Sequence, residues 1–180
     1  DYHVEEYVRE MNLAAVKLAR DLADEYTAKN PDKPRFVAGS VGPTNKTCSM
    51  SPDVNNPAYR ALSYDELAAS YQQQMEAMLE GGVDAILIET IFDTLNAKAA
   101  IFAAEQAMKM IGIEVPIMLS VTVSDIGGRT LSGQTLDAFL ASVQHANIFS
   151  VGLNCSFGAR QLKPFLEQLA SRAPYYISAY

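Results

Sequence analysis

The sequence is poor in the side chains that enzymes most often use for nucleophilic catalysis and metal binding. Its 180 residues include two cysteines, Cys48 and Cys155, two histidines, His3 and His145, and no tryptophan. Two cysteines so far apart do not form a disulfide framework, and a reducing cytoplasm is the simplest compartment. Because a thiol nucleophile needs a histidine or another cation beside it, few positions could carry covalent chemistry.

Basic clusters and long apolar runs are also missing. Lys and Arg number 14 against 21 Asp and Glu, which gives a formal net charge of −7. An acidic chain without a basic cluster does not suit a nucleic-acid or an anionic membrane surface. No apolar stretch reaches the ~20 residues of a membrane helix, and the acidic start has no signal-peptide pattern. We therefore expect a globular cytoplasmic protein that binds neither nucleic acid nor membranes.

Helical and strand patterns alternate along the chain with mostly short connections. Strands are predicted at 35–44, 83–90, 115–124, 147–155 and 174–180, and helices at 4–26, 63–80, 94–110, 135–145 and 160–173. This alternation predicts parallel strands joined by right-handed helical crossovers. No shift in composition marks a second domain, so residues 1–180 are expected to form a single one.

Two α/β architectures fit this alternation. The length favours a doubly wound open sheet, because a complete eight-stranded barrel typically takes ~250 residues. The strand ends favour a barrel, because nearly every predicted strand finishes on a polar or small residue, and a barrel gathers these ends at one mouth. They are Ser40, Gly42, Glu89, Thr90, Thr122, Ser124, Asn154, Cys155 and Ser178. We predict a partial (βα)8 TIM-type barrel with about five parallel strands and intervening helices.

Glu89 and Cys155 are the two strand-end residues with the clearest chemistry. A carboxylate directly after the apolar run at 85–88 is costly to desolvate unless a cation meets it. A substrate ammonium group would serve, and so would a neighbouring Lys or Arg. Cys155 could be an inert buried thiol or one ligand of a zinc ion, since neither histidine is placed to activate it as a nucleophile. Cys48 lies in a long loop that we expect to be mobile and on the surface, which makes it a poor second ligand.

Four segments closely resemble a known family, and the similarity extends over the whole chain. They are FVAGSVGPTNKT (36–47), ILIETIFDTLNAKAA (86–100), SVTVSDIGGRTLSGQT (120–135) and GLNCSFGARQLKPFLEQL (152–169). Together they are similar to the homocysteine-binding barrel at the N-terminus of cobalamin-dependent methionine synthases.

The resemblance implies a site that holds zinc through three cysteine thiolates, with Cys155 as the first. The other two belong to a Gly-Gly-Cys-Cys motif that this sequence does not contain. Glu89 corresponds to the glutamate that meets the amino group of homocysteine, and Ser40, Thr122 and Asn154 are the further substrate-binding candidates. Methylcobalamin, carried on another domain, would donate the methyl group, so the implied partners are homocysteine and the folate- and cobalamin-binding domains. No residue of this chain is assigned a catalytic role.

The same resemblance implies that the chain is a fragment of that barrel, lacking the first two strands and the last. One cysteine cannot hold zinc tightly, so we expect the fragment alone to be inactive. Open edges at 36–40 and 175–179 would favour self-association. Two other functions stay open: a cobalamin-independent homocysteine S-methyltransferase that uses betaine or S-methylmethionine, and a non-catalytic binding or assembly module.

Overall fold

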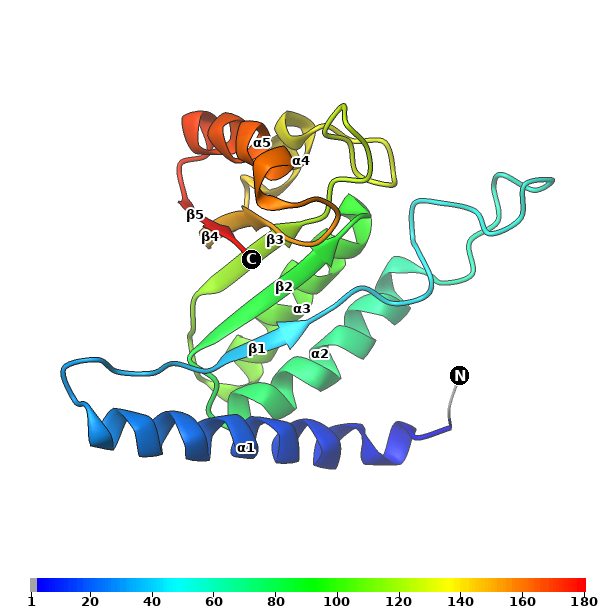
Figure 1. The fold of residues 1–180 in the computed structure, drawn as a ribbon. Helices are drawn as coiled ribbons and strands as arrows, with labels where there is room; N and C mark the ends of the chain where they lie inside the picture. The colour runs from blue at the N-terminus through cyan, green and yellow to red at the C-terminus, as the bar shows by residue number, and fades with distance from the viewer. Residues whose placement is uncertain (1–2) are drawn as a thin grey trace.

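The computed structural model describes residues 3–180, in which helices and strands alternate as the sequence predicts (Figure 1). A 3-10 turn at Glu5–Tyr7 precedes α1 (Val8–Lys29), β1 (Ala38–Val41), α2 (Tyr64–Glu80), β2 (Ala85–Ile91), α3 (Thr94–Ile111), β3 (Ile117–Val121), α4 (Leu136–Val143), β4 (Ile148–Leu153), α5 (Ala159–Arg172) and β5 (Tyr176–Ala179). The strands form one sheet in the order β1-β2-β3-β4-β5, and every neighbouring pair is parallel.

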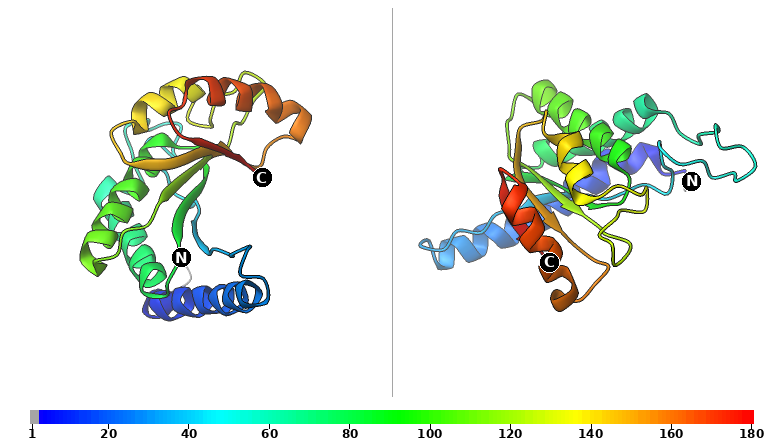
Figure 2. Two further views of the ribbon diagram at one scale, coloured as in Figure 1. Left: turned by 90° about the vertical axis from the view of Figure 1, so that its left-hand side faces the viewer. Right: turned by 90° about the horizontal axis from the view of Figure 1, so that it is seen from above.

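The strand order identifies the architecture as part of a barrel. Consecutive strands are always neighbours, so the order never reverses and the sheet has none of the switch points of a doubly wound fold. The sheet curves into an arc with the helices on its outer side (Figure 2). These features confirm the predicted partial TIM-type barrel. Among the described residues, β1 and β5 each pair with one neighbour, which leaves the arc open at both edges.

The hydrophobic core lies between the sheet and its outer helices. Ile86, Leu119 and Val151 of the three central strands are almost fully buried. The side of α3 facing them is rich in alanine, and these small side chains allow the helix to pack closely against the sheet and α2. Parallel strands covered by helices are expected to be continuously apolar, as β2 is through Ile88.

Three of the helices begin at residues whose side chains cap the first turn. Ser63 and Glu66 form a complete capping box at the start of α2. Asp93 accepts hydrogen bonds from the first turn of α3, and Thr135 does so for α4. Gly112 ends α3 with φ of 76°, in the left-handed region that glycine adopts readily.

Several bounds differ from the predicted ones. The first helix begins at Val8 because residues 5–7 form the 3-10 turn. It continues past the predicted end to Lys29. The last helix begins at Ala159 instead of residue 160, which makes Pro164 its sixth residue. Each strand is shorter than predicted. The polar residues Ser40, Glu89 and Ser178 still lie within β1, β2 and β5, whereas Thr122, Asn154 and Cys155 follow the ends of β3 and β4.

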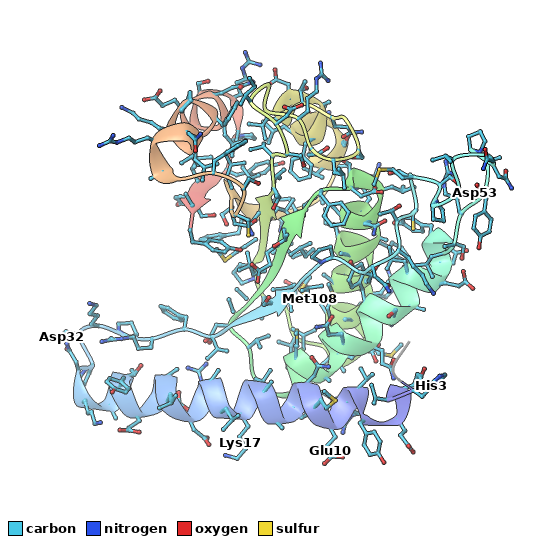
Figure 3. The ribbon with its side chains drawn as sticks, turned by 45° about the vertical axis from the view of Figure 1, so that its right-hand side comes forward. His3, Glu10, Lys17, Asp32, Asp53 and Met108 are labelled. Atoms are coloured by element: carbon cyan, nitrogen blue, oxygen red, sulfur yellow. The ribbon has the colours of Figure 1, made fainter. Side chains whose placement is uncertain are left out.

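The loop between β1 and α2 extends away from the barrel arc, with Asp53 near its far end (Figure 3). Glu10 and Lys17 project from α1 on the side away from the sheet, as a solvent-facing helical surface should (Figure 3). Within residues 3–180, no helix combines the length and the apolarity that crossing a bilayer requires.

Candidate active site at the carboxyl ends of the strands

A carboxylate stands near the end of β2 at the rim where the parallel strands finish. Glu89 is half-buried, and its two carboxylate oxygens accept hydrogen bonds from the hydroxyls of Ser40 and Tyr180, the latter at 2.7 Å. None of the salt bridges formed among residues 3–180 involves Glu89. Within this range Glu89 therefore has no Lys or Arg partner, which leaves the carboxylate accessible to a cation at the rim.

Tyr180, which follows β5, is a site residue that the sequence did not reveal. Partial burial raises the pKa of Tyr180 to about 12, and the hydrogen bond to Glu89 acts in the same direction. The negative charge of a Cys155 thiolate would raise this pKa further, so the phenol lies within electrostatic range of both groups. The available signal was a side chain with a polar group at the end of a predicted strand, the pattern that identified Glu89 and Cys155.

Asn154 connects the ends of β2, β3 and β4 from a buried position. Only 1% of its surface is exposed, and its Oδ1 accepts from Thr90 N at 3.1 Å and from Ser120 Oγ at 2.8 Å. Its Nδ2 donates to Thr90 Oγ1 at 2.9 Å and to Cys155 Sγ at 3.2 Å. An asparagine amide has two acceptor and two donor positions, and all four are used. Direct substrate binding by Asn154 stays a prediction, and one that this geometry does not favour.

The two other predicted substrate-binding residues also lie at this rim. Thr122 is half-buried and donates through Oγ1 to the backbone carbonyl of Asn154 at 3.3 Å. Ser40 is exposed at the end of β1, where it donates to Glu89. The structure thus brings together every residue that the sequence assigned to the site, although their roles stay predictions.

The Cys155 thiol is exposed at the rim, directly after β4 and Asn154. An inert thiol enclosed in the core is therefore excluded. His145 follows α4, at the amino end of β4, and cannot reach this sulfur. Cys155 and Ser156 have φ of 60° and 62°, in a left-handed conformation that is uncommon for residues other than glycine. Such backbone outliers cluster at functional sites, where the surrounding structure holds them in place.

Cys48 is buried, and the expectation of a mobile surface cysteine is wrong. The base of its loop folds over the start of α3, where Asn96 Oδ1 accepts from Cys48 N at 2.8 Å. The guanidinium of Arg60 donates to the Cys48 carbonyl at 3.0 Å. Burial, with a smaller contribution from the charge of Asp93, raises the pKa of the Cys48 thiol. A buried and protonated thiol is a poor metal ligand.

The described residues offer one metal ligand rather than a closed site. No group of three His, Cys, Asp or Glu side chains within residues 3–180 is arranged to hold a metal ion. The exposed Cys155 sulfur, which receives a hydrogen bond from the Asn154 amide, fits one thiolate of a larger ligand set.

A parallel α/β barrel arc with polar groups gathered at the carboxyl ends of its strands has the architecture of TIM-barrel enzymes, whose active sites lie there. A family model described as homocysteine S-methyltransferase matches residues 1–180. The chain belongs to the homocysteine S-methyltransferase family. The predicted resemblance is confirmed at this level, and the specific assignment to cobalamin-dependent methionine synthase stays a prediction.

Solved structures of one enzyme share the fold. The homocysteine methyltransferase MmuM from Escherichia coli, in its apo form, aligns with a TM-score of 0.78 and 21% identity over 100% of this chain and 62% of that chain. Its metallated form aligns with a TM-score of 0.76 and 21% identity over 96% of this chain and 57% of that chain. The chain therefore spans less than two thirds of the length of MmuM. At this identity the likeness establishes the fold.

Proposed function

We propose that the chain is the central part of a homocysteine-binding barrel that methylates homocysteine on sulfur to give methionine. Family membership supports this reaction, and one geometric observation carries it for this chain. Glu89, a carboxylate without a cationic partner among residues 3–180, and the exposed Cys155 lie at the same rim. Cys155 receives a hydrogen bond from Asn154, and Asn154 also binds Thr90, the residue that follows Glu89. Homocysteine has an ammonium group at one end and a thiol at the other, which matches this pair of groups.

The roles follow from that match. The Glu89 carboxylate, oriented by Ser40 and Tyr180, would receive the substrate ammonium group, and Thr122 lies on the same rim. The substrate sulfur would then lie toward Cys155. A free thiol has a pKa of about 8.5 and is mostly protonated at neutral pH, so its attack on a methyl donor requires ionisation.

Zinc bound partly through Cys155 would supply that ionisation, because coordination to a strong Lewis acid lowers the pKa of a thiol and its proton is released to solvent. The metallated form of MmuM supports a metal in this fold. By the family resemblance, the two other thiolates come from a Gly-Gly-Cys-Cys segment absent from this sequence. We accordingly propose that residues 1–180 form a single domain lacking the first two strands and the last strand of the barrel. We propose that it is inactive by itself.

The methyl donor is proposed to be methylcobalamin, presented by a separate domain of a cobalamin-dependent methionine synthase. The four motif segments support this assignment over the cobalamin-independent enzymes that use betaine or S-methylmethionine. Incubating the full-length protein with homocysteine and each donor in turn separates these functions. Turnover with methylcobalamin alone supports the proposal, and turnover with either other donor contradicts it.

The metal and substrate roles are tested by replacing each of the two cysteines in the full-length protein. Cys155→Ser should remove bound zinc and abolish homocysteine binding in calorimetry. Cys48→Ser makes the same chemical change at a buried thiol and should leave both unchanged. Unaltered zinc content in Cys155→Ser would contradict the proposal and favour a non-catalytic binding or assembly module.

A further inference from the structure

Two segments at the rim have an unusual backbone conformation, and one side chain connects them. Thr90 near the end of β2 has φ of 57°, and Cys155 after β4 has φ of 60°. A left-handed backbone is a clear outlier for a β-branched residue such as threonine. A conformation of this kind persists only where neighbouring groups fix it. The group that contacts both residues is the side chain of Asn154.

The hydrogen bonds of Asn154 divide into two functional sets. Toward β2, the amide binds Thr90 twice, accepting from its backbone N–H and donating to its hydroxyl. These two bonds fix the residue that directly follows Glu89. Toward its own loop, the second amide hydrogen points at Cys155 Sγ, 3.2 Å away. Ser120 supplies the fourth bond from β3 and completes the set.

The Asn154 N–H group beside the Cys155 sulfur acts as a hydrogen-bond donor as well as packing against it. A hydrogen bond from an N–H group stabilises the negative charge of a thiolate and occupies one of its lone pairs. Because Cys155 is exposed, its sulfur stays accessible at the rim, where a metal would bind. Groups that orient a metal ligand in this way tune both the geometry and the affinity of the metal.

We propose that Asn154 is a positioning residue, which orients the Cys155 sulfur toward a metal and keeps it at a set distance from the Glu89 carboxylate by holding Thr90. This assignment replaces direct substrate contact as the role of Asn154. It rests on the proposed function, because it takes Cys155 as a zinc ligand. It also explains why an asparagine with no free hydrogen-bonding capacity stands directly beside that cysteine.

The test uses the full-length protein with Asn154→Asp and Asn154→Ala. Aspartate retains the two acceptor positions, which bind Thr90 N and Ser120, but lacks both donors. We expect both variants to bind zinc about 10- to 100-fold more weakly in a chelator competition, as is typical when an outer-shell partner is removed. With Co²⁺ in place of zinc, the sulfur-to-metal charge-transfer band should shift, which a general loss of stability would not cause.

Ser150→Ala is the matched control, because Ser150 lies on β4, the strand that Asn154 follows. Ser150 Oγ is buried, but it has no hydrogen-bond partner among the described residues and does not contact Cys155. Its removal should leave zinc affinity and the cobalt band unchanged. Wild-type affinity and an unshifted band in Asn154→Asp would overturn the assignment. Cys155→Ser distinguishes this failure from that of the proposed function, because undiminished zinc binding there would overturn the metal role itself.

A measurement on the wild-type protein decides the matter if neither variant folds. The side-chain amide protons of Asn154, observed by NMR after selective asparagine labelling, should shift when zinc is added. They should not respond to zinc in Cys155→Ser. Amide protons that stay in place while the wild-type protein takes up zinc would overturn the positioning role.

Discussion

Glu89→Gln is the substitution that most directly tests the geometry of the rim, because it removes a charge and keeps the size of the side chain. Glutamine can still bind the hydroxyls of Ser40 and Tyr180, so the local structure should persist. The negative charge, however, acts on two cations or protons that can be followed separately. One is the phenolic proton of Tyr180, and the other, under the proposed function, is the ammonium group of homocysteine.

The effect on Tyr180 can be bounded from the structure. Its pKa stands at about 12 against an ordinary value of 10.0, a difference of two units or ~2.7 kcal/mol. Partial burial is the largest cause and survives the substitution, so the pKa should fall toward 10 without reaching it. Tyr180 is 59% exposed, and solvent screening reduces its coupling to Glu89 to about 1 kcal/mol.

The assay is an alkaline titration followed by the ultraviolet absorbance of tyrosinate. The sequence contains nine tyrosines, and subtracting the titration curve of Tyr180→Phe isolates Tyr180 from the other eight. The same subtraction in the E89Q background gives the shifted value. An unchanged titration would show that the Glu89–Tyr180 hydrogen bond does not exist in solution.

Homocysteine binding by the full-length protein gives the second readout of Glu89→Gln. A hydrogen bond to a charged group contributes about 1.5–3 kcal/mol, so calorimetry should show affinity reduced roughly 10- to 150-fold. Undiminished affinity would refute the assignment of the ammonium group to Glu89. If the pKa of Tyr180 falls but the affinity for homocysteine does not change, the Glu89–Tyr180 hydrogen bond is correct and the substrate-binding role of Glu89 is wrong.

Two further predictions concern stability. Tyr71 is 5% exposed, and burial raises its pKa to about 12. The neutral phenol therefore contributes ~2.7 kcal/mol to the free energy of unfolding, a contribution that is complete below pH 10 and is lost as the pH rises through 12. Urea unfolding at about pH 9 and about pH 11 should show about half of this loss, ~1.3 kcal/mol, in the wild type and a smaller loss in Tyr71→Phe, and equal losses in the two proteins would contradict the prediction. Gly152→Ala would place a Cβ 2.2 Å from the carbonyl oxygen of Ser178, so it should separate β4 from β5 and lower the unfolding free energy by about 1–3 kcal/mol. Gly42→Ala, which meets open space, should change stability by less than about 0.5 kcal/mol, and a similar loss in both variants would refute the steric reasoning.

The positions of the helices and strands were largely predictable because their signals are local. A capping residue such as Ser63 and the glutamate three positions later lie within one helical turn, so their partnership is visible in the sequence. Glu89 and Cys155 were identifiable as candidates because polar residues after buried strands have a defined place in parallel α/β folds. The burial of Cys48 was not predictable, since it depends on a loop folding over the start of α3.

By itself, the sequence determined the alternation of helices and strands, the capping residues and the chemical character of the strand ends. Hydrophobic periodicity specifies which face of an element is buried, but the same periodicity suits an open sheet and a barrel. Only the tertiary structure decided the consecutive strand order, and with it the single rim at which the strands end. It also decided that Asn154 binds Thr90, 64 residues away, and that Tyr180 reaches Glu89, 91 residues away. Contacts over such separations depend on strand pairing and sheet curvature, which no local pattern encodes.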